Sequence, residues 1–534
     1  MLKISKLSFW NSIPFLTLLL FIAPVLIVLS SIFSGFSDNI NHIFSVLLIE
    51  YVSNSLVLVF GVSILVFLIG VTTAWLVTNY NFFGKKILEW ALILPLAIPP
   101  YILAYTFTGL FDSFGTLNNF AREIFFLDET AVLFPNVRNI YGGIIIFGFT
   151  LYPYLYLLAR MSFLNQSQSM IEAGRMLGLN KFQVFQKISL PLIRPAIIGG
   201  LIIVAMEVLS DFGAVEHFAI PTFTTGIFKA WNGMYDITAA MQLASLLLIF
   251  LIVLIVLERT SRRDSIFSPQ SSNFKPVKEK KLKGMKNLMA FAICFLPIFI
   301  GFLLPVGELS VWALNHNSVF FTDKFLQDAL NTLAVSLIAA ILCTALALVI
   351  NFAVRLNKNN LLKTLSSFLT IGYGMPGLIL AIGILQLTTS IDKSFNIFLT
   401  GSLFGLIMAY LIKSYALPNL SIEAGFTRID QKLDDSAKTL KSTGWDMLFN
   451  IHFPLLKGSL FTGLLLVFAE IVKELPATLV LQPFNFDTLA VSTYKYAVEE
   501  RMFEAAAPAI SIVLIGLIPI IFLSQMIRRS RPVK

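Results

Sequence analysis

The sequence predicts an all-α, polytopic membrane protein of about 12 transmembrane helices, arranged as two duplicated six-helix halves. Of its 534 residues, 57% are hydrophobic and 13% are charged, whereas a soluble globular chain is about one quarter charged. Uncharged apolar runs long enough to cross a bilayer recur along the whole length, and two long stretches repeat one another in register. Cys294 and Cys343 both lie in apolar runs, which excludes a disulfide framework.

About twelve apolar runs are long enough to cross a hydrocarbon core of about 30 Å. They lie at 15–32, 55–77, 88–110, 141–158, 195–209 and 237–257 in the first half, and at 288–312, 332–354, 365–387, 398–411, 459–475 and 505–527 in the second. The first run follows Lys3 and Lys6, as the apolar part of a signal peptide would. It is too long for that role and no cleavage site follows it, so we expect an uncleaved helix.

The 39 Lys and Arg residues are concentrated in alternate connections between these runs. Short cytoplasmic loops collect basic residues, so this distribution predicts that both termini are cytoplasmic, together with the basic segments 159–195, 258–287 and 413–457. The formal net charge of +9 then follows from topology and from attraction to anionic membrane lipid. A nucleic-acid partner is not needed to explain it.

The two halves are related by a parallel duplication. Asn54-Ser-Leu opens the second run and Asn331-Thr-Leu opens the eighth, an offset of 277 residues. Later in each half the offset is 263, because the third outer loop is longer in the first half. Further pairs matched by these offsets are Lys86 and Lys363, Pro99 and Pro376, Leu177 and Leu440, Ile188 and Ile451, Pro191 and Pro454, and Glu207 and Glu470. Each half holds an even number of runs, so both halves have the same orientation.

A patterned polar segment follows the fourth run of each half, at 171–191 and 434–454. In the first segment we expect Glu172 in the first turn of a helix, Gly178 in a left-handed exit and Pro191 after a second helix. Apolar ridges at helical spacing are formed by Phe182, Phe185 and Ile188 in the first segment and by Trp445, Leu448 and Ile451 in the second. A helix lying on the membrane surface is the simpler interpretation of one copy. Two copies at matching positions predict a two-fold docking site for a dimeric partner.

The first segment resembles the EAA loop of type I ABC importer permeases. Its matching residues are Glu172, Ala173, Gly178, Ile188, Leu190 and Pro191, and only Gly174 departs from the pattern. The second segment resembles the loop more loosely, through Asp435, Ala437 and Pro454. Lys441 stands where the pattern has glycine. Because lysine is costly in a left-handed exit, we expect Gly444 to supply the bend instead.

The resemblance implies a type I ABC importer permease fold in a bacterial inner membrane. In that family each EAA loop docks on a cytoplasmic ABC ATPase dimer, and a periplasmic or extracytoplasmic substrate-binding protein delivers the substrate. The chain contains no phosphate-binding P-loop sequence, so we expect a non-enzymatic subunit that binds no cofactor, with ATP used by the partner. The expected domains are an N-terminal helix and outer loop (1–50), a first type-1 transmembrane domain (51–258), a cytoplasmic linker (259–287), a seventh helix and outer loop (288–327), a second type-1 domain (328–527) and a basic cytoplasmic tail (528–534).

The segments 210–232 and 472–498 resemble the corresponding parts of fused ferric iron permeases. Ferric iron is therefore the predicted substrate. Thiamine, aminophosphonate and polyamine import are alternatives within the same family. An ion-gradient-driven secondary transporter with parallel six-helix repeats is an alternative of another class.

Four acidic residues fall at the outer ends of predicted spans. Glu207 and Asp211 are four residues apart and are expected on one helix face, and Glu470 and Glu474 repeat that arrangement. An ionised group near the bilayer centre costs about 3 kcal/mol, so such residues usually face a pore or a partner. They are predicted to line a translocation path for a cationic cargo. Structural pairing with Lys473 is the alternative.

Proline and glycine residues interrupt two of the predicted spans at corresponding positions. Pro99 and Pro100 in the third span, and Pro376 and Gly377 in the ninth, predict helix breaks. Such breaks mark either a binding site or kinks that serve packing. The four histidines are scattered along the chain, so no metal site is assigned.

Overall fold

The computed structural model describes residues 9–263, 279–357, 360–442 and 444–529. Lys3 and Lys6, most of the predicted linker and most of the predicted basic tail lie outside these residues. Within the described ranges, nine helices are long and apolar enough to cross a membrane, and three further pairs of bent helices raise the number to as many as twelve. The predicted all-α membrane fold is confirmed.

The first half holds the elements up to the predicted linker. They are α1 (Phe9–Ser30), α2 (Asp38–His42), α3 (Leu48–Asn79), β1 (Tyr80–Asn81), α4 (Lys85–Ala91), α5 (Pro100–Phe111), α6 (Thr116–Phe125), α7 (Ile140–Leu164), α8 (Gln168–Met176), α9 (Lys181–Val184), α10 (Leu190–Leu192), α11 (Arg194–Ser210), α12 (Gly213–His217), α13 (Phe223–Phe228) and α14 (Ile237–Arg263). The helix α6 lies in the long third outer loop, which had been expected only as a loop.

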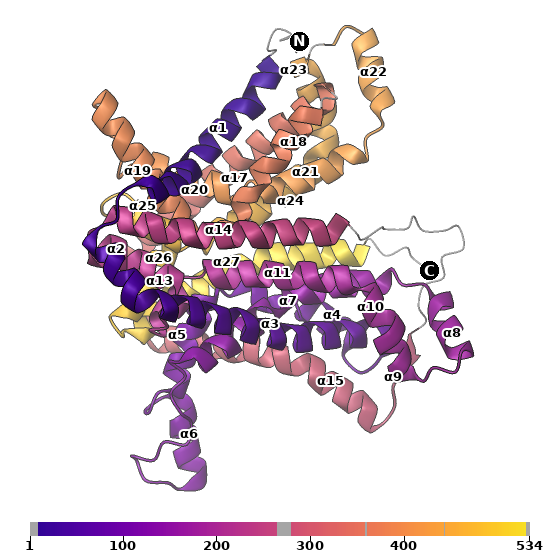
Figure 1. The fold of residues 1–534 in the computed structure, drawn as a ribbon. Helices are drawn as coiled ribbons and strands as arrows, with labels where there is room; N and C mark the ends of the chain where they lie inside the picture. The colour runs from indigo at the N-terminus through magenta and orange to yellow at the C-terminus, as the bar shows by residue number, and fades with distance from the viewer. Residues whose placement is uncertain (1–8, 264–278, 358–359, 443, 530–534) are drawn as a thin grey trace.

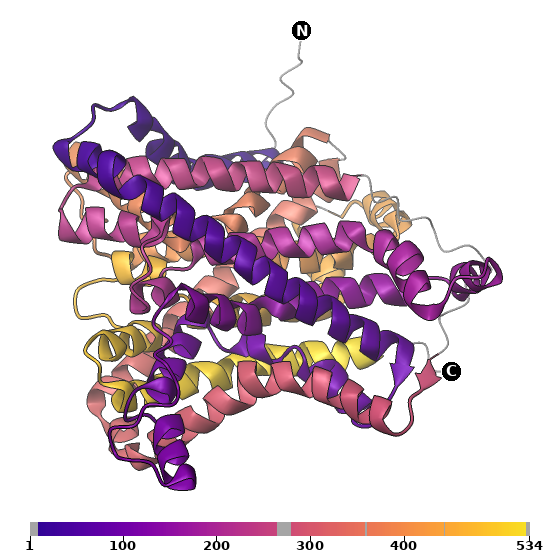
Figure 2. The same ribbon diagram turned by 60° about the horizontal axis from the view of Figure 1, so that its bottom comes forward.

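The second half repeats this order. Its elements are β2 (Lys280–Lys281), α15 (Met285–Ile298), α16 (Leu304–Asn315), α17 (Asp323–Asn357), α18 (Asn360–Leu369), α19 (Gly377–Phe395), α20 (Leu403–Ser414), α21 (Ala416–Thr427), α22 (Gln431–Thr439), α23 (Gly444–Asp446), α24 (Phe453–Val472), α25 (Pro476–Leu481), α26 (Leu489–Val498) and α27 (Met502–Arg529). Strands β1 and β2 form a short parallel pair, with Tyr80 opposite Lys280, at the end of the long helix α3 (Figure 2).

Each half forms a bundle around three long elements. In the first half α3 packs against α7 and α11, and in the second half α17 packs against α21 and α24. The two bundles meet near α13, α25 and α26, and they splay apart toward α8 and α22 (Figure 1). The two patterned polar segments therefore lie at the ends of the diverging bundles, away from the region where the halves meet.

The first helix of each half packs against the other half. Helix α1 contacts α17, α18 and α19 of the second half, whereas α15 contacts α3 and α4, and α16 contacts α5, in the first half. The closest approach is at Gly383 in α19, where an added Cβ would lie 2.6 Å from the carbonyl oxygen of Pro24 and 3.0 Å from a methyl group of Val28. Glycine is needed there because the two helices are almost in backbone contact.

The helices break at the predicted prolines. Pro99 is extended, with ψ 146°, and α5 begins at Pro100; the segments on either side of this break are bent by 92°. In the second half Pro376 precedes α19, which begins at Gly377. A further bend of 48° separates α20 from α21, so the predicted span at 398–411 is longer than expected and continues to Thr427. Its counterpart α7 is continuous.

The close contact at Gly383 predicts the effect of substitution. In Gly383→Ala the added methyl group forces α1 and α19 apart, and overpacking of this kind costs about 1–3 kcal/mol. We expect the melting temperature of the purified permease in mild detergent to fall by several degrees. Gly307 in α16 is the matched control, because an added Cβ meets nothing within 4 Å. A Gly307→Ala variant that is destabilised as much as Gly383→Ala would contradict the steric explanation.

Candidate functional site

The first loop (171–191) folds as a helix, a left-handed turn and a second helix. Helix α8 begins at Gln168, so Glu172 lies in its second turn and not in the first turn, as had been expected. The Glu172 carboxylate accepts a hydrogen bond from Gln168 Nε2 at 2.9 Å. Gly178 has φ +82°, the left-handed conformation that the sequence predicted. The departure at Gly174 also has a cause, because an added Cβ would lie 2.3 Å from Ile188 Cδ1.

The second loop (434–454) has the same shape, although lysine replaces glycine at its turn. Lys441 itself adopts the left-handed conformation, with φ +60°. The expectation that Gly444 supplies the bend was therefore wrong. Gly444 has another role, because an added Cβ there would lie 2.8 Å from the Trp10 indole nitrogen. The start of α1 thus packs directly against the second loop, where the Trp10 and Trp445 ring centroids are 4.8 Å apart.

The predicted apolar ridges are only partly exposed. In the first loop Phe182 is 65% exposed, but Phe185 packs on Trp75 of α3 with ring centroids 4.8 Å apart. In the second loop Trp445 is 44% exposed, whereas Leu448 is 1% exposed. The ridge as predicted was therefore wrong in part, because most of its members anchor the second helix of each loop to the bundle.

A matched pair of leucines was missed as a candidate contact. Leu177 is 82% exposed and Leu440 is 83% exposed, and each directly precedes the left-handed residue of its loop. The turn places the leucine beyond the end of α8 or α22, where no neighbouring helix covers it. Their shared register under the 263 offset was the available signal.

The second loop is anchored by a buried ion pair with a buried histidine beside it. Asp434 accepts from Arg355 Nε at 2.6 Å, and His452 Nε2 lies 3.0 Å from the other carboxylate oxygen of Asp434. His452 is fully buried and Asp434 is 7% exposed. In the first loop Ile171 and Ser189 occupy the positions of Asp434 and His452. The exposed Asp435, which the resemblance pointed to, lies beside this anchor on the outer side of α22.

The four predicted membrane acids come together between the halves. Glu207, Asp211, Glu470 and Glu474 line one cavity of about 100 Å³. Its other polar residues are Thr150, Tyr154, Ser210, Lys413 and Lys473, and the broken segment of the third span contributes Pro99, Pro100 and Tyr101. The Tyr101 hydroxyl is buried without a hydrogen-bond partner among the described residues.

Two of the acids cap short helices instead of lying on a helix face. Helix α11 ends at Ser210, and Asp211 Oδ1 accepts from the backbone N–H of Ala214 at 2.9 Å. In the same way Glu474 lies beyond the end of α24 and accepts from the N–H of Ala477 at 3.1 Å. The predicted shared face was therefore wrong, because the helix stops between the two acids of each half.

Lysines neutralise the acids of the second half only. Lys473 pairs with Glu470 at 2.9 Å, and Lys413 pairs with Glu474 at 2.9 Å. Lys413 had been assigned to the cytoplasmic side, and the structure corrects this by placing it in the cavity wall between the halves. Neither Glu207 nor Asp211 forms an ion pair with a described residue.

The duplication shows that these lysines have neutral counterparts in the first half. At the 263 offset Lys413 corresponds to Thr150, and Lys473 corresponds to Ser210. All four of these side chains line the cavity. Glu207 is thus the one membrane acid that is committed neither to an ion pair nor to a helix cap. Among the described residues, no group of three or more His, Cys, Asp or Glu side chains is arranged to hold a metal ion.

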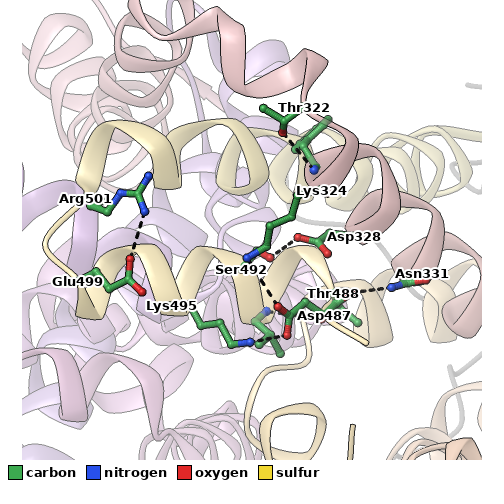
Figure 3. Close-up of polar contacts among 12 residues, drawn as sticks. Thr322, Lys324, Asp328, Asn331, Asp487, Thr488, Ser492, Lys495, Glu499 and Arg501 are labelled. Atoms are coloured by element: carbon green, nitrogen blue, oxygen red, sulfur yellow. Dashed lines mark hydrogen bonds and ion pairs between the residues drawn. The ribbon is translucent and has the colours of Figure 1, made fainter. Parts of the chain in front are cut away.

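On the opposite side of each bundle from the loops, the segment after the fifth span docks on the start of the second long helix. Asn331 Nδ2 donates to the carbonyl of Asp487 at 3.0 Å, directly before Thr488, which caps α26 (Figure 3). Asn54 makes the equivalent bond to the carbonyl before Thr222, at 3.0 Å.

The second-half copy of this docking is the more highly charged. Asp487 pairs with Lys495 at 2.6 Å and lies 3.9 Å from Lys324, and Ser492 donates to Asp328 (Figure 3). In the first half Tyr51 covers Gly226 at the positions of Asp328 and Ser492, so an apolar contact replaces a polar one.

Two duplicated helical bundles, with broken helices around a charged cavity at their interface and a polar loop at the end of each, define a membrane permease. The chain belongs to the family of binding-protein-dependent transport system inner membrane components, whose pattern matches residues 66–258 and 345–532. Both loops fall within the matched segments. Membership of a binding-protein-dependent family displaces the ion-gradient-driven alternative, and it describes a transport component and not a catalytic enzyme.

The relatives carry several substrates in their names. The chain is 24% identical over 496 residues to the Fe(3+)-transport system permease protein FbpB 2 of Haemophilus influenzae, covering 92% of each chain. It is 24% identical over 468 residues to the ferric transport system permease protein FbpB of Actinobacillus pleuropneumoniae, covering 84% of this chain and 66% of the relative. It is also 26% identical over 194 residues to the sulfate transport system permease protein CysW of Escherichia coli, covering 34% and 63% respectively.

The left-handed lysine predicts opposite effects of two substitutions. A side chain in this conformation costs about 1–2 kcal/mol, so Lys441→Gly should stabilise the second loop by up to about 1 kcal/mol. Gly178→Lys should destabilise the first loop by a similar amount. Hydrogen exchange of the amides in α22 and α8 measures both effects. Faster exchange of α22 in Lys441→Gly would show that lysine contributes contacts that outweigh the strain.

Proposed function

We propose that this chain is the translocation subunit of a ferric iron importer, driven by ATP hydrolysis on a separate cytoplasmic ATPase dimer. A soluble binding protein outside the membrane would deliver the iron, and both termini of the chain would be cytoplasmic. The chain itself would bind no cofactor. The observation that carries the proposal is the interfacial cavity, in which four carboxylates face two lysines. The likeness to ferric transport permeases over nearly the whole chain supports the same substrate.

The excess of carboxylates distinguishes a cationic cargo from an anionic one. Relatives named for sulfate and molybdenum transport match shorter parts of the chain, and their oxyanions would be repelled by this cavity. Carboxylate oxygens suit a hard cation such as ferric iron. A transporter must also release its cargo, and a cavity without an arranged metal site among the described residues fits transient contact.

The two loops provide the coupling to the ATPase. Leu177 and Leu440 are the most exposed apolar side chains that occupy the same position in both loops, and Phe182 and Trp445 form a second, less exposed pair. Large exposed apolar side chains in matched positions are typical anchors for a partner surface. A dimeric ATPase presents the same groove twice, which is what a duplicated loop requires.

Charged substitutions at these leucines should uncouple the ATPase. Leu177→Asp or Leu440→Asp places an unpaired carboxylate in the interface, and losses of about 2 kcal/mol or more, roughly 30-fold in affinity, are typical of anchor residues. We expect loss of ATPase co-purification in mild detergent, with the double variant the weakest. Phe398 is 94% exposed on the predicted outer side, so Phe398→Asp is the control. Undiminished ATPase recovery with the double variant would overturn the assignment.

The asymmetry of the cavity predicts different results for Glu207 and Glu470. In Glu207→Gln a carboxylate that forms no ion pair with a described residue is lost, so iron uptake should fall by about tenfold or more while the assembled complex remains as abundant as before. In Glu470→Gln the partner Lys473 is left unpaired in the membrane, so the melting temperature should fall as well.

The measurement is uptake of iron by proteoliposomes that contain the permease, its ATPase and a ferric-loaded binding protein. Parallel preparations with thiamine, aminophosphonate and polyamine donors test the other substrates. Glu470→Gln combined with Lys473→Gln is the matched control, because it removes the pair without leaving an unpaired charge. Normal iron uptake by Glu207→Gln would exclude the proposed path, and stimulation by another donor alone would exclude iron as the substrate.

A further inference from the structure

A second cavity, of about 550 Å³, lies inside the second half between α17, α18 and α21. It is distinct from the cavity between the halves and opens on the same side as the second loop, to which it is joined through Gln431 at the start of α22. Its polar and charged lining residues include Asn351, Arg355, Lys363, Ser366, Asn419 and Glu423. Nothing in the proposed transport path or in the ATPase docking uses it.

The same place in the first half is filled by side chains. Tyr156 is fully buried and donates its hydroxyl to the backbone carbonyl of Glu89 at 2.7 Å. The Glu89 carboxylate forms an ion pair with Arg160, whose side chain is 5% exposed. These contacts clamp α4 to α7.

Each of the three clamping residues is replaced in the second half. By the two offsets of the duplication, Glu89 corresponds to Ser366, Tyr156 to Asn419 and Arg160 to Glu423. All three replacements are smaller, and the ion pair has no equivalent. The 48° bend between α20 and α21, which α7 lacks, accompanies the change. At this position the second half therefore has a polar cavity where the first half has a clamp.

The cavity wall carries charges of both signs. The Arg355 guanidinium is held by Asp434 at 2.6 Å and by the Phe426 carbonyl at 2.8 Å. Lys363 is exposed and forms no ion pair with a described residue. Glu423 supplies a carboxylate on the opposite wall, from α21. A ligand that carries both a negative and a positive group would satisfy Lys363 and Glu423 together.

Neutral hydrogen-bonding groups complete the wall. Asn419 is 3% exposed, and its Oδ1 accepts from Asn351 Nδ2 at 2.8 Å and from Tyr415 Oη at 3.1 Å. Its Nδ2 has no acceptor among the described residues and remains a donor. Ser366, Ser367 and Thr370 lie on the same side as Lys363, and the hydroxyls of Ser367 and Thr370 donate to the backbone carbonyls of Lys363 and Ser367.

The rim of the cavity is apolar and faces outward. Leu420 on α21 lines the cavity and is 61% exposed. On α18, Leu361 is 61% exposed and Phe368 is 47% exposed, although the opposite face of this helix is polar or buried. A helix of this kind is suited to the interface between headgroups and acyl chains. The ligand is therefore expected to have an apolar tail as well as a charged head.

We propose that this cavity binds the headgroup of a phospholipid that carries a phosphate and a primary amine. The phosphate would contact Lys363 and the free Nδ2 donor of Asn419, because basic pockets between membrane helices on the cytoplasmic side are typical phosphate sites. The ammonium group would contact Glu423, and the acyl chains would leave over Leu420. In the second half the lipid headgroup would fill the space that corresponds to the one filled by Glu89, Tyr156 and Arg160 in the first half. This proposal stands whether or not the transported substrate is iron.

The experiment is native mass spectrometry of the full permease after reconstitution in nanodiscs and release into mild detergent. The nanodiscs contain phosphatidylethanolamine, phosphatidylglycerol or an equal mixture of the two. We expect one tightly retained phosphatidylethanolamine per chain. Lys363→Ala should reduce its retention about tenfold, as expected for one charge-assisted contact. Lys86→Ala is the matched control, because Lys86 occupies the same position in the first half, and it should change nothing.

Two further variants separate the proposal from a loss of folding. Glu423→Gln should abolish the preference for phosphatidylethanolamine over phosphatidylglycerol while leaving retention of a phospholipid intact. The triple variant Ser366→Glu, Asn419→Tyr, Glu423→Arg restores the first-half clamp and should retain no lipid. Equal retention by Lys363→Ala and the unchanged protein would overturn the site. Binding of soluble phosphoethanolamine as tightly as the lipid would overturn the lipid as its source.

Discussion

Every break in a membrane helix leaves backbone N–H and carbonyl groups that water does not reach, and the structure depends on how they are satisfied. At the interface of the halves, α11 ends before the short helix α12 begins, and α24 ends before the short helix α25 begins. Asp211 and Glu474 then accept from the free N–H groups that begin α12 and α25. These caps fix the broken ends in place, and they thereby hold Glu207 and Glu470 one turn away in the cavity wall. The position of the charged site therefore follows from the capping of these backbone N–H groups.

Each half contains one copy of the helix break, the membrane acids and the polar loop. The residues of the two copies differ, so the two halves differ in their chemistry. The second half has buried ion pairs that the first half lacks, between Lys413 and Glu474 and between Arg355 and Asp434, whereas only the first half has the Glu89 and Arg160 pair. Buried pairs of this kind fix geometry more than they add stability. The first half has neutral residues, Thr150 and Ser210, at the positions of Lys413 and Lys473, so Glu207 forms no ion pair with a described residue. The two halves therefore share a backbone arrangement but differ in the charged residues that they place around the cavity.

Much of the fold was predictable because a bilayer restricts the options. Apolar run length indicated the spans, the repeat indicated the two halves, and Gly178 indicated the turn of the first loop. The errors have local physical causes. Lys441 tolerates the left-handed conformation because the loop around it is already anchored, so the bend did not move. Lys413 has a charge that normally indicates the cytoplasmic side, and only the fold reveals its partner, Glu474 of the same half.

The exchange of first helices between the halves has a mechanical consequence. Helix α1 belongs to the first half by sequence, lies along α19 of the second half, and near its start packs Trp10 against Trp445 of the second loop. Any rotation of that loop must therefore displace α1, which is covalently joined to the first-half bundle. The close contact at Gly383 leaves little room for α1 to move relative to α19. The motions of the two halves are therefore coupled through α1, and neither half can rotate as an independent rigid body.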